Sequence, residues 1–275
     1  MTKPATGRRG HLRMHRLPAL LIAVASAILA ACNDAGPAPE APTTAPTTTP
    51  APALPTVTVS EALAGAVNER ATATCEATAR LHENVTRFLD APSASTLTAA
   101  RQNWQDAHQR YRELVSLYLL AGIGLPQIGD DRDPIDAWPI LPGYLDEVAG
   151  YPRSGMVFSE VPLTPEFLRE EHQSTDFLYL TRGFHPLAVM LDGDGDGAPR
   201  HEAFAQADDD EQGINAPQRR ADLTRLMSNQ LTKDIRVLCS QTEQQQLAEA
   251  LARVVETLPE PVPAAHEPAS EEPGQ

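Results

Sequence analysis

Apolar side chains recur at steps of three and four residues in two long stretches, which is the spacing of one face of an α-helix. The first stretch carries Val67, Thr74, Thr78, Leu81, Val85 and Phe88. The second carries Leu97, Ala100, Trp104, Ala107, Tyr111, Leu114 and Tyr118. The short segment Asp90 to Ser93 favours a turn between them, and Gly122 and Gly124 end the second helix. The sequence therefore predicts two long antiparallel helices that share an apolar seam.

The following residues predict more helices and no strands. Residues 123–161 are rich in Gly, Pro and Asp and predict a long irregular excursion with at most short helices. Thr164 and Pro165 are residue types that begin a helix. Further helices are expected over residues 184–191, 217–238 and 247–258. We expect an all-α fold over residues 57–258, an up-and-down helical bundle with the irregular excursion between its second and third main helices.

The N-terminus has the pattern of an exported lipoprotein. Five basic residues and no acid precede an apolar run from Leu17 to Ala31, which is too short to span a membrane comfortably. The run ends Leu29-Ala30-Ala31-Cys32, and this resembles the lipobox of bacterial lipoproteins. We therefore interpret residues 1–31 as a signal peptide and Cys32 as the lipidated residue. An ordinary signal peptide with a chance cysteine is the alternative. The interpretation places the protein in the bacterial cell envelope, held on a membrane by lipid.

Two segments beside the helical region lack the composition of a folded domain. Residues 32–56 are mostly Ala, Pro and Thr, with no aromatic residue and almost no charge, so they cannot bury enough apolar surface to fold. Because Pro favours extended conformations, this segment is interpreted as a semi-rigid tether. Residues 259–275 are rich in Pro, Glu and Ala, and we expect a disordered tail.

The chain is strongly acidic. Its formal net charge is −15, and loss of the five basic residues of the signal leaves 17 basic against 37 acidic residues, a net charge of −20. Nucleic acid is disfavoured as a partner because it is itself a polyanion. The acidity allows cation binding without requiring it.

Two cysteines besides Cys32 remain, Cys75 and Cys239. In an oxidising compartment a disulfide between them is the default expectation. Two separately buried thiols are the alternative. A bridge would join the first long helix to the end of the helix that begins at Pro217.

Three stretches resemble the imelysin family, the M75 peptidases, which are helical-bundle proteins of the bacterial envelope tied to iron uptake. One stretch is Trp104 to Tyr111 followed by Ile135-Asp136-Ala137-Trp138-Pro139. Another is Gly183-Phe184-His185-Pro186-Leu187-Ala188, at the place of the family's G-x-H-x-x-E motif. The third is the helix with the pair Arg219 and Arg220. The resemblance implies a metal-linked envelope function, with other envelope proteins of an iron-uptake system as partners.

This sequence also departs from the family pattern. Ala188 stands where the motif has Glu. Val115 stands where the first helix of the family has a second glutamate, although Glu113 is two residues away in this sequence. A methyl group can neither ligate a metal nor act as a base. Family members usually have two bundle halves, and this chain resembles the first half. A metallopeptidase needs a held metal, an open coordination position and a general base. We therefore expect binding rather than cleavage, with a residual metal-dependent hydrolase as the alternative.

His185 and Asp136 are the candidate metal ligands that the resemblance leaves. Asp136 could support His185 if the fold brings the two side chains together. The residues alone favour another interpretation, in which His185 is a buried histidine with a satisfied hydrogen bond. Asp136-Ala-Trp-Pro equally predicts an Asx-type turn with a packed indole. Arg219 and Arg220 are expected on the surface or at a helix dipole rather than as substrate clamps.

A second candidate site lies directly after this motif. Asp192, Asp194 and Asp196 alternate before Gly197, as in the first half of a calcium loop. Position twelve of such a loop, where a bidentate acid belongs, is Ala203, and Glu202 is one place early. Because the loop offers three carboxylates and the motif around His185 one histidine, we expect a modest response of stability to calcium and little response to iron or zinc, with a transition metal at His185 or no metal as the alternatives. A flexible acidic loop and a calcium-stabilised structural lipoprotein are the corresponding alternatives.

Overall fold

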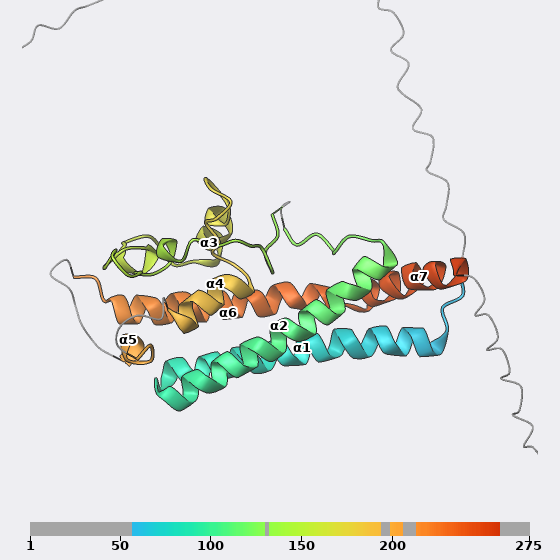
Figure 1. Ribbon diagram of the computed structural model, residues 1–275, viewed down its shortest axis with the longest axis horizontal. Coiled ribbons are helices and arrows are strands. Elements are labelled where there is room, and N and C mark those ends of the chain that lie inside the picture. Colours follow the sequence, from blue (N-terminus) through green and yellow to red (C-terminus); the bar gives the residue numbers. More distant parts are fainter. Residues whose placement is uncertain (1–56, 130–131, 194–198, 206–212, 259–275) are drawn as a thin grey trace, which may run out of the picture. The chain divides into compact units, whose positions relative to one another are not determined.

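The computed structural model describes residues 57–129, 132–193, 199–205 and 213–258. The predicted signal peptide, tether and tail, with Cys32, Asp194 and Asp196, lie outside the described residues. Four long helices form the bundle: α1 (Glu61–Asp90), α2 (Ala94–Ala121), α6 (Ala216–Leu238) and α7 (Gln241–Thr257). Figure 1 shows α6 and α7 following one another along the α1–α2 pair, and α7 contacts both of these helices. No strand occurs among the described residues, so the all-α prediction is confirmed.

The predicted apolar seam is the core of the bundle. All six positions on α1 that recur at helical spacing are buried. The same holds for α2, except that Trp104 is only partly buried. Ser60 caps α1, and Ser93 and Thr96 form a reciprocal capping box at the start of α2. Gly122 ends α2 in the left-handed region, at φ 66°, as expected of a glycine at this place.

The region between α2 and α6 consists of short helices and turns joined by irregular segments. It contains two 3-10 turns, η1 (Pro142–Tyr144) and η2 (Met156–Phe158), and the helices α3 (Pro165–Glu171), α4 (Phe184–Asp192) and α5 (Glu202–Ala205). The hydroxyl of Thr164 accepts from the backbone N–H of Phe167, as the predicted cap requires. The expectation of an irregular excursion with short helices is therefore confirmed. Helix α4 packs against both α2 and α6, so this excursion lies directly on the bundle.

A buried carboxylate fixes the excursion to α6. Both oxygens of Asp146 accept hydrogen bonds from the guanidinium of Arg220, at 2.6 and 2.8 Å, and Arg200 adds a third at 2.7 Å. Burial raises the pKa of Asp146, but the hydrogen bonds and charges of the two arginines outweigh this and hold it below its usual value. The expected surface position of Arg220 is therefore wrong, since its side chain is only 3% exposed. Arg219 donates to three backbone carbonyls, those of Met156, Val157 and Val161.

A disulfide joins Cys75 on α1 to Cys239, the residue that caps the C-terminus of α6. The predicted pairing is thus confirmed in the described structure. The bond joins two residues that are 164 positions apart, and the loop between them contains α2, the whole excursion and α6. Among the described residues, no helix combines the length and apolar character needed to cross a membrane.

Candidate metal centre

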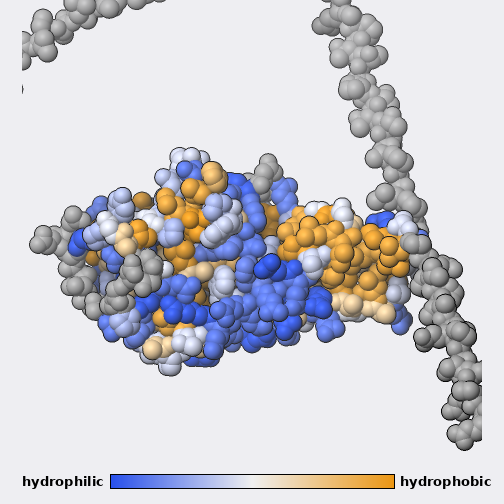
Figure 2. Space-filling model, in the orientation of Figure 1, coloured by the Kyte–Doolittle hydropathy of each residue, from blue (hydrophilic) through white to orange (hydrophobic). Residues whose placement is uncertain are grey.

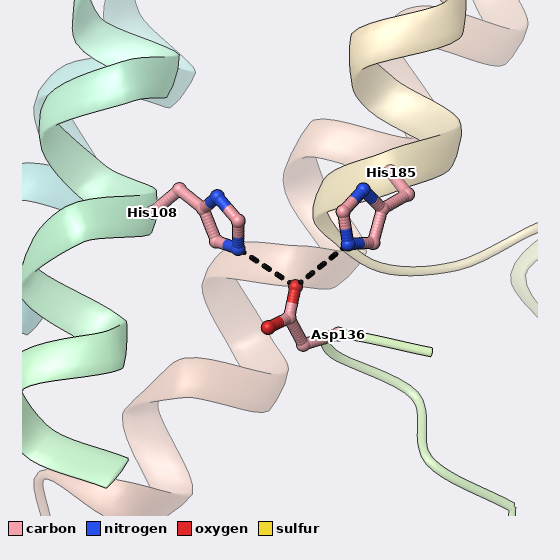
Figure 3. A group of neighbouring side chains, drawn as sticks. All are labelled: His108, Asp136 and His185. Atoms are coloured by element: carbon pink, nitrogen blue, oxygen red, sulfur yellow. Dashed lines mark hydrogen bonds and ion pairs between the residues drawn. The ribbon is translucent and has the colours of Figure 1, made fainter. Parts of the chain in front are cut away.

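Three side chains from separate elements meet beside the bundle. His108 comes from the middle of α2, His185 from the first turn of α4, and Asp136 from the irregular segment after α2. Figure 3 shows one carboxylate oxygen of Asp136 between the two imidazole rings. Nε2 of His108 lies 2.8 Å from this oxygen, and Nε2 of His185 lies 3.1 Å from it. The ligand atoms of all three residues lie within 4.8 Å of one another, and this is the one group of its kind among the described residues.

The glycine of the motif allows α4 to start where it does. Gly183 has φ 102°, a conformation that side chains disfavour, and an added Cβ would collide with the carbonyl of Ile135. The close approach lets the N–H of Phe184 donate to that same carbonyl at 2.8 Å. The indole N–H of Trp104 donates to the carbonyl of Phe184, also at 2.8 Å. The first turn of α4 is thus tied both to the segment of Asp136 and to the helix of His108.

The buried residue His172, outside the cluster, forms hydrogen bonds to the two irregular segments that precede Asp136 and His185. Nε2 of His172 donates to the carbonyl of Asp133 at 2.7 Å. Its Nδ1 accepts from the backbone N–H groups of Thr181 and Arg182, at 3.2 and 3.3 Å. Because Asp133 precedes Asp136 by three residues and Arg182 precedes His185 by three, His172 sets the spacing between the two ligand segments. The neutral ring is the form that satisfies all three bonds.

The predicted Asx-type turn is present, but the side chain that forms it belongs to Asp133 and not to Asp136. The carboxylate of Asp133 accepts from the N–H groups of Ile135 and Asp136, at 2.9 and 3.2 Å. The side chain of Asp136 is left for the histidines. The expected packed indole is also wrong, since Trp138 is 67% exposed and its ring lies 4.8 Å from that of His185.

The two imidazoles keep Asp136 ionised. Partial burial raises the pKa of its carboxyl group, but the hydrogen bonds from His108 and His185 are together stronger and lower it to about 2. The side chains of the three residues are 15–26% exposed, so solvent reaches the cluster. A full negative charge flanked by two nitrogen ligands, and accessible from outside, is an arrangement that a cation can enter.

The donor set fits a divalent transition metal. Two imidazoles and one carboxylate with further positions open suit iron(II), and the same ligand types suit zinc. Two ligands of one zinc ion stand about 3–4 Å apart at usual bond lengths. The two histidine nitrogens lie 2.8 and 3.1 Å from the Asp136 oxygen, and all three ligand atoms lie within 4.8 Å of one another, so the cluster is close to this spacing. Calcium is a poorer fit because it takes six to eight oxygen ligands.

Sequence reasoning found two of these three residues. The fold brings His185 and Asp136 together as the metal interpretation required, while the hydrogen bond predicted for a buried His185 is also present and is made to Asp136. His108 was missed, although it stands one helical turn after Trp104 in the stretch that carried the resemblance. In the second candidate site, the carboxylate of Asp192 pairs with Arg101 at 2.8 Å. Its partners Asp194 and Asp196 lie outside the described residues.

Comparison with known families assigns the helical domain to one of them. The sequence model of the M75 peptidases, described as imelysin, matches residues 67–269, which span both histidines and Asp136. The chain belongs to the imelysin family. No curated protein matches it.

The structure shows what surrounds Ala188 and Val115, the two positions where this imelysin lacks the expected glutamates. Ala188 lines a small cavity of about 90 Å³ together with Arg101, Trp104 and Gln105, where a longer side chain would fit. Val115 packs at the edge of the core. The nearby carboxylate of Glu113 is held by Arg70 and Arg110, at 2.6 and 3.3 Å, and it is not one of the three clustered ligand groups.

Proposed function

We propose that this imelysin is a lipid-anchored protein of the bacterial cell envelope that binds a divalent transition metal at His108, Asp136 and His185 without cleaving peptides. The convergence of three ligand atoms from three separate elements carries the proposal. A site with three protein ligands keeps coordination positions open, whereas a closed structural zinc site uses four. Open positions suit reversible capture and transfer of an ion, which is the role we assign in iron or other metal uptake.

Absence of peptide cleavage follows from the missing carboxylates. A metal-dependent peptidase needs a general base within reach of the metal-bound water. Asp136 would serve as a ligand of the proposed metal, and Ala188 and Val115 stand where the family pattern has acids. Glu113 is paired with arginines and does not belong to the cluster.

Metal titration of the mature chain tests the binding site. Iron(II), added without oxygen, or zinc should raise the melting temperature, because a ligand that binds only the folded state stabilises it by roughly 2.7 kcal/mol at a hundredfold excess over Kd. His108→Ala and His185→Ala should each abolish the shift. His201→Ala, which removes a histidine outside the cluster, is the matched control and should retain it. A shift with calcium alone, or one that survives both cluster variants, contradicts the proposal.

The two remaining parts of the proposal have separate tests. The mature chain should not cleave unstructured protein substrates, with or without zinc. Chelator-sensitive cleavage that disappears in His185→Ala would restore the hydrolase function. Cys32→Ser should release the protein from the membrane fraction or leave the signal uncut. Normal processing and unchanged membrane partition of this variant would refute the anchor.

A further inference from the structure

An uncharged stretch with exposed aliphatic side chains interrupts this acidic protein. Residues 114–129, Leu-Val-Ser-Leu-Tyr-Leu-Leu-Ala-Gly-Ile-Gly-Leu-Pro-Gln-Ile-Gly, contain no charged residue, although the chain carries a net charge of −15. Leu119 is 74% exposed and Leu120 is 66% exposed, at the end of α2, where nothing in the bundle covers them. Figure 2 shows apolar surface gathered over the C-terminal end of α2, the segment that follows it, and α7. We call this surface the apolar end, formed by the exposed residues Leu119, Leu120, Ile123, Leu125, Val255 and Leu258.

The described chain begins and finishes at this same part of the domain. Helix α7 contacts both α1 and α2, and Figure 1 shows the start of α1 and the end of α7 beside each other. Leu258, the last described residue before the tail, is itself 62% exposed. Only residues 33–56 separate the predicted lipidated cysteine from Val57. A tether of this length, in extended form, reaches at most about 75 Å at 3.1 Å per residue.

We propose that the apolar end docks onto the surface of the bilayer that holds the lipid anchor, with its aliphatic side chains at the boundary between headgroups and acyl chains. This inference rests on the lipid anchoring in the proposed function. The anchor confines the domain within a short distance of the bilayer, so the effective concentration of the surface is high. A modest apolar surface that binds a free protein only weakly is then enough to hold a tethered one.

The chemistry of the surface favours lipid over a protein partner. Protein interfaces are enriched in aromatic residues and Arg at their centres, where Leu and Val seldom contribute most of the binding energy. The exposed side chains that define the apolar end are only Leu, Ile and Val. Because residues 114–129 are uncharged, insertion of this part of the apolar end among headgroups desolvates no side-chain charge. On α7, the exposed Glu256 lies between Val255 and Leu258, so its carboxylate must stay at the level of the headgroups. The acidity of the chain as a whole disfavours anionic headgroups, so the expected surface is zwitterionic.

Docking would place the metal centre at a defined distance from the membrane. His108 stands eleven residues before Leu119 on the same helix, which is about 16 Å along the axis at 1.5 Å per residue. A docked domain thus presents its open coordination positions close to the bilayer surface, where a membrane transporter would receive the ion.

The test uses the mature, lipidated chain in phosphatidylcholine vesicles. With Cys75 and Cys239 bonded and Cys32 lipidated, Leu120→Cys supplies one free thiol for a polarity-sensitive fluorophore. We expect a blue-shifted, apolar emission. Phe177→Cys is the matched control, because Phe177 is 64% exposed but lies outside the apolar end, and its label should report water. Water-like emission at both positions in the anchored protein overturns the docking proposal while leaving the anchor intact.

A second measurement separates lipid from a second copy of the chain. The mature chain with Cys32→Ser, which has no lipid, should float weakly with phosphatidylcholine vesicles. The double variant Leu119→Glu, Leu120→Glu in this background should lower the bound fraction about tenfold. Phe177→Glu should leave it unchanged. Sedimentation should show a monomer. A dimer that the double variant dissociates would assign the apolar end to self-association and overturn the proposal. Failure of the anchor itself would appear separately, as unchanged membrane partition of Cys32→Ser in cells.

Discussion

The long helices and the excursion between α2 and α6 are held together by different interactions. The helices α1, α2, α6 and α7 pack through aliphatic and aromatic side chains repeated at helical spacing. The excursion is held by charged side chains that bind backbone carbonyls across long stretches of sequence. Arg132 donates to the carbonyls of Arg169, Glu170 and His172, and Arg200 donates to that of Met190. Where backbone is not paired in a regular helix, its carbonyls need other donors, and partly buried arginines supply them here.

This difference explains where the proposed metal centre lies. His108 stands on a regular helix of the bundle, whereas Asp136 and His185 come from two segments of the excursion that are 49 residues apart. A rigid helix supplies one ligand, and the polar network sets the position of the other two. The centre should therefore be sensitive to loss of the network and insensitive to changes elsewhere in the bundle.

The largest expected effect is loss of the buried carboxylate. Asp146→Ala leaves Arg220 and Arg200 buried without their counter-charge, and removal of one partner of such a pair costs about 3–5 kcal/mol. Denaturant unfolding measures the change. Arg225→Ala removes an exposed pair with Asp90 and is the control, expected to cost about 0–1 kcal/mol. Similar small losses in both variants would show that the network does not hold the excursion.

An intermediate effect is expected from the disulfide. Replacement of both Cys75 and Cys239 by Ser should lower the free energy of unfolding by about 2–4 kcal/mol, since the bond restricts a long loop in the unfolded chain. Zinc affinity of the folded protein should stay within about twofold, because neither cysteine contacts the metal centre. Complete loss of zinc binding under conditions where the variant is folded would break the distinction between bundle and excursion.

The smallest expected effect is on the dependence of stability on pH. Burial, with the charges of Arg182 and Arg132, lowers the pKa of His172 below 6.5, although the bond to Asp133 partly offsets this. Below about pH 6.5, His172 therefore binds a proton in the unfolded chain but stays neutral in the folded chain. The free energy of unfolding thus falls as the pH falls toward the lowered pKa. His82, whose pKa burial also lowers, adds a slope of the same sign.

His172→Gln should flatten this slope by up to about 1.4 kcal/mol per pH unit and leave the part due to His82. Urea unfolding between pH 5 and 8 measures it. The variant should be less stable at pH 8, where the lost hydrogen bonds are the only difference, and should approach the wild type toward pH 5. Parallel curves over the whole range would mean that His172 does not stay neutral in the folded protein.

The same contrast sets the limit of what the sequence predicts. The helical stripes of α1 and α2, the cap at Thr164 and the glycine stop at Gly122 are local patterns, and each is found as expected. Contacts within the excursion join residues far apart and follow no period. Asp146 and Arg220, 74 residues apart, look like surface residues in the sequence. Their burial depends on the packing of η2 and α5 against α6, which no local pattern encodes.

His108 shows most clearly which part of the site the sequence alone does not predict. Its neighbours Trp104 and Tyr111 stand out as large apolar residues, while His108 has the spacing of an ordinary partly exposed helix position. Its role arises because the carbonyl of Phe184 accepts from Trp104 and so draws the first turn of α4, with His185, onto this part of α2. The sequence offered one signal, a histidine one helical turn after the motif tryptophan. That spacing indicates a ligand only once the contact between Trp104 and α4 is known.

Metal K-edge absorption spectroscopy of the zinc-loaded mature chain tests the central claim most directly. Zinc bound by His108, Asp136 and His185 should show two imidazole ligands, with the remaining scatterers oxygen at about 2.0–2.2 Å. His108→Ala should reduce the imidazole count to one or remove the metal altogether. A spectrum with no imidazole scattering, unchanged in His108→Ala and His185→Ala, would place the ion elsewhere and contradict the account.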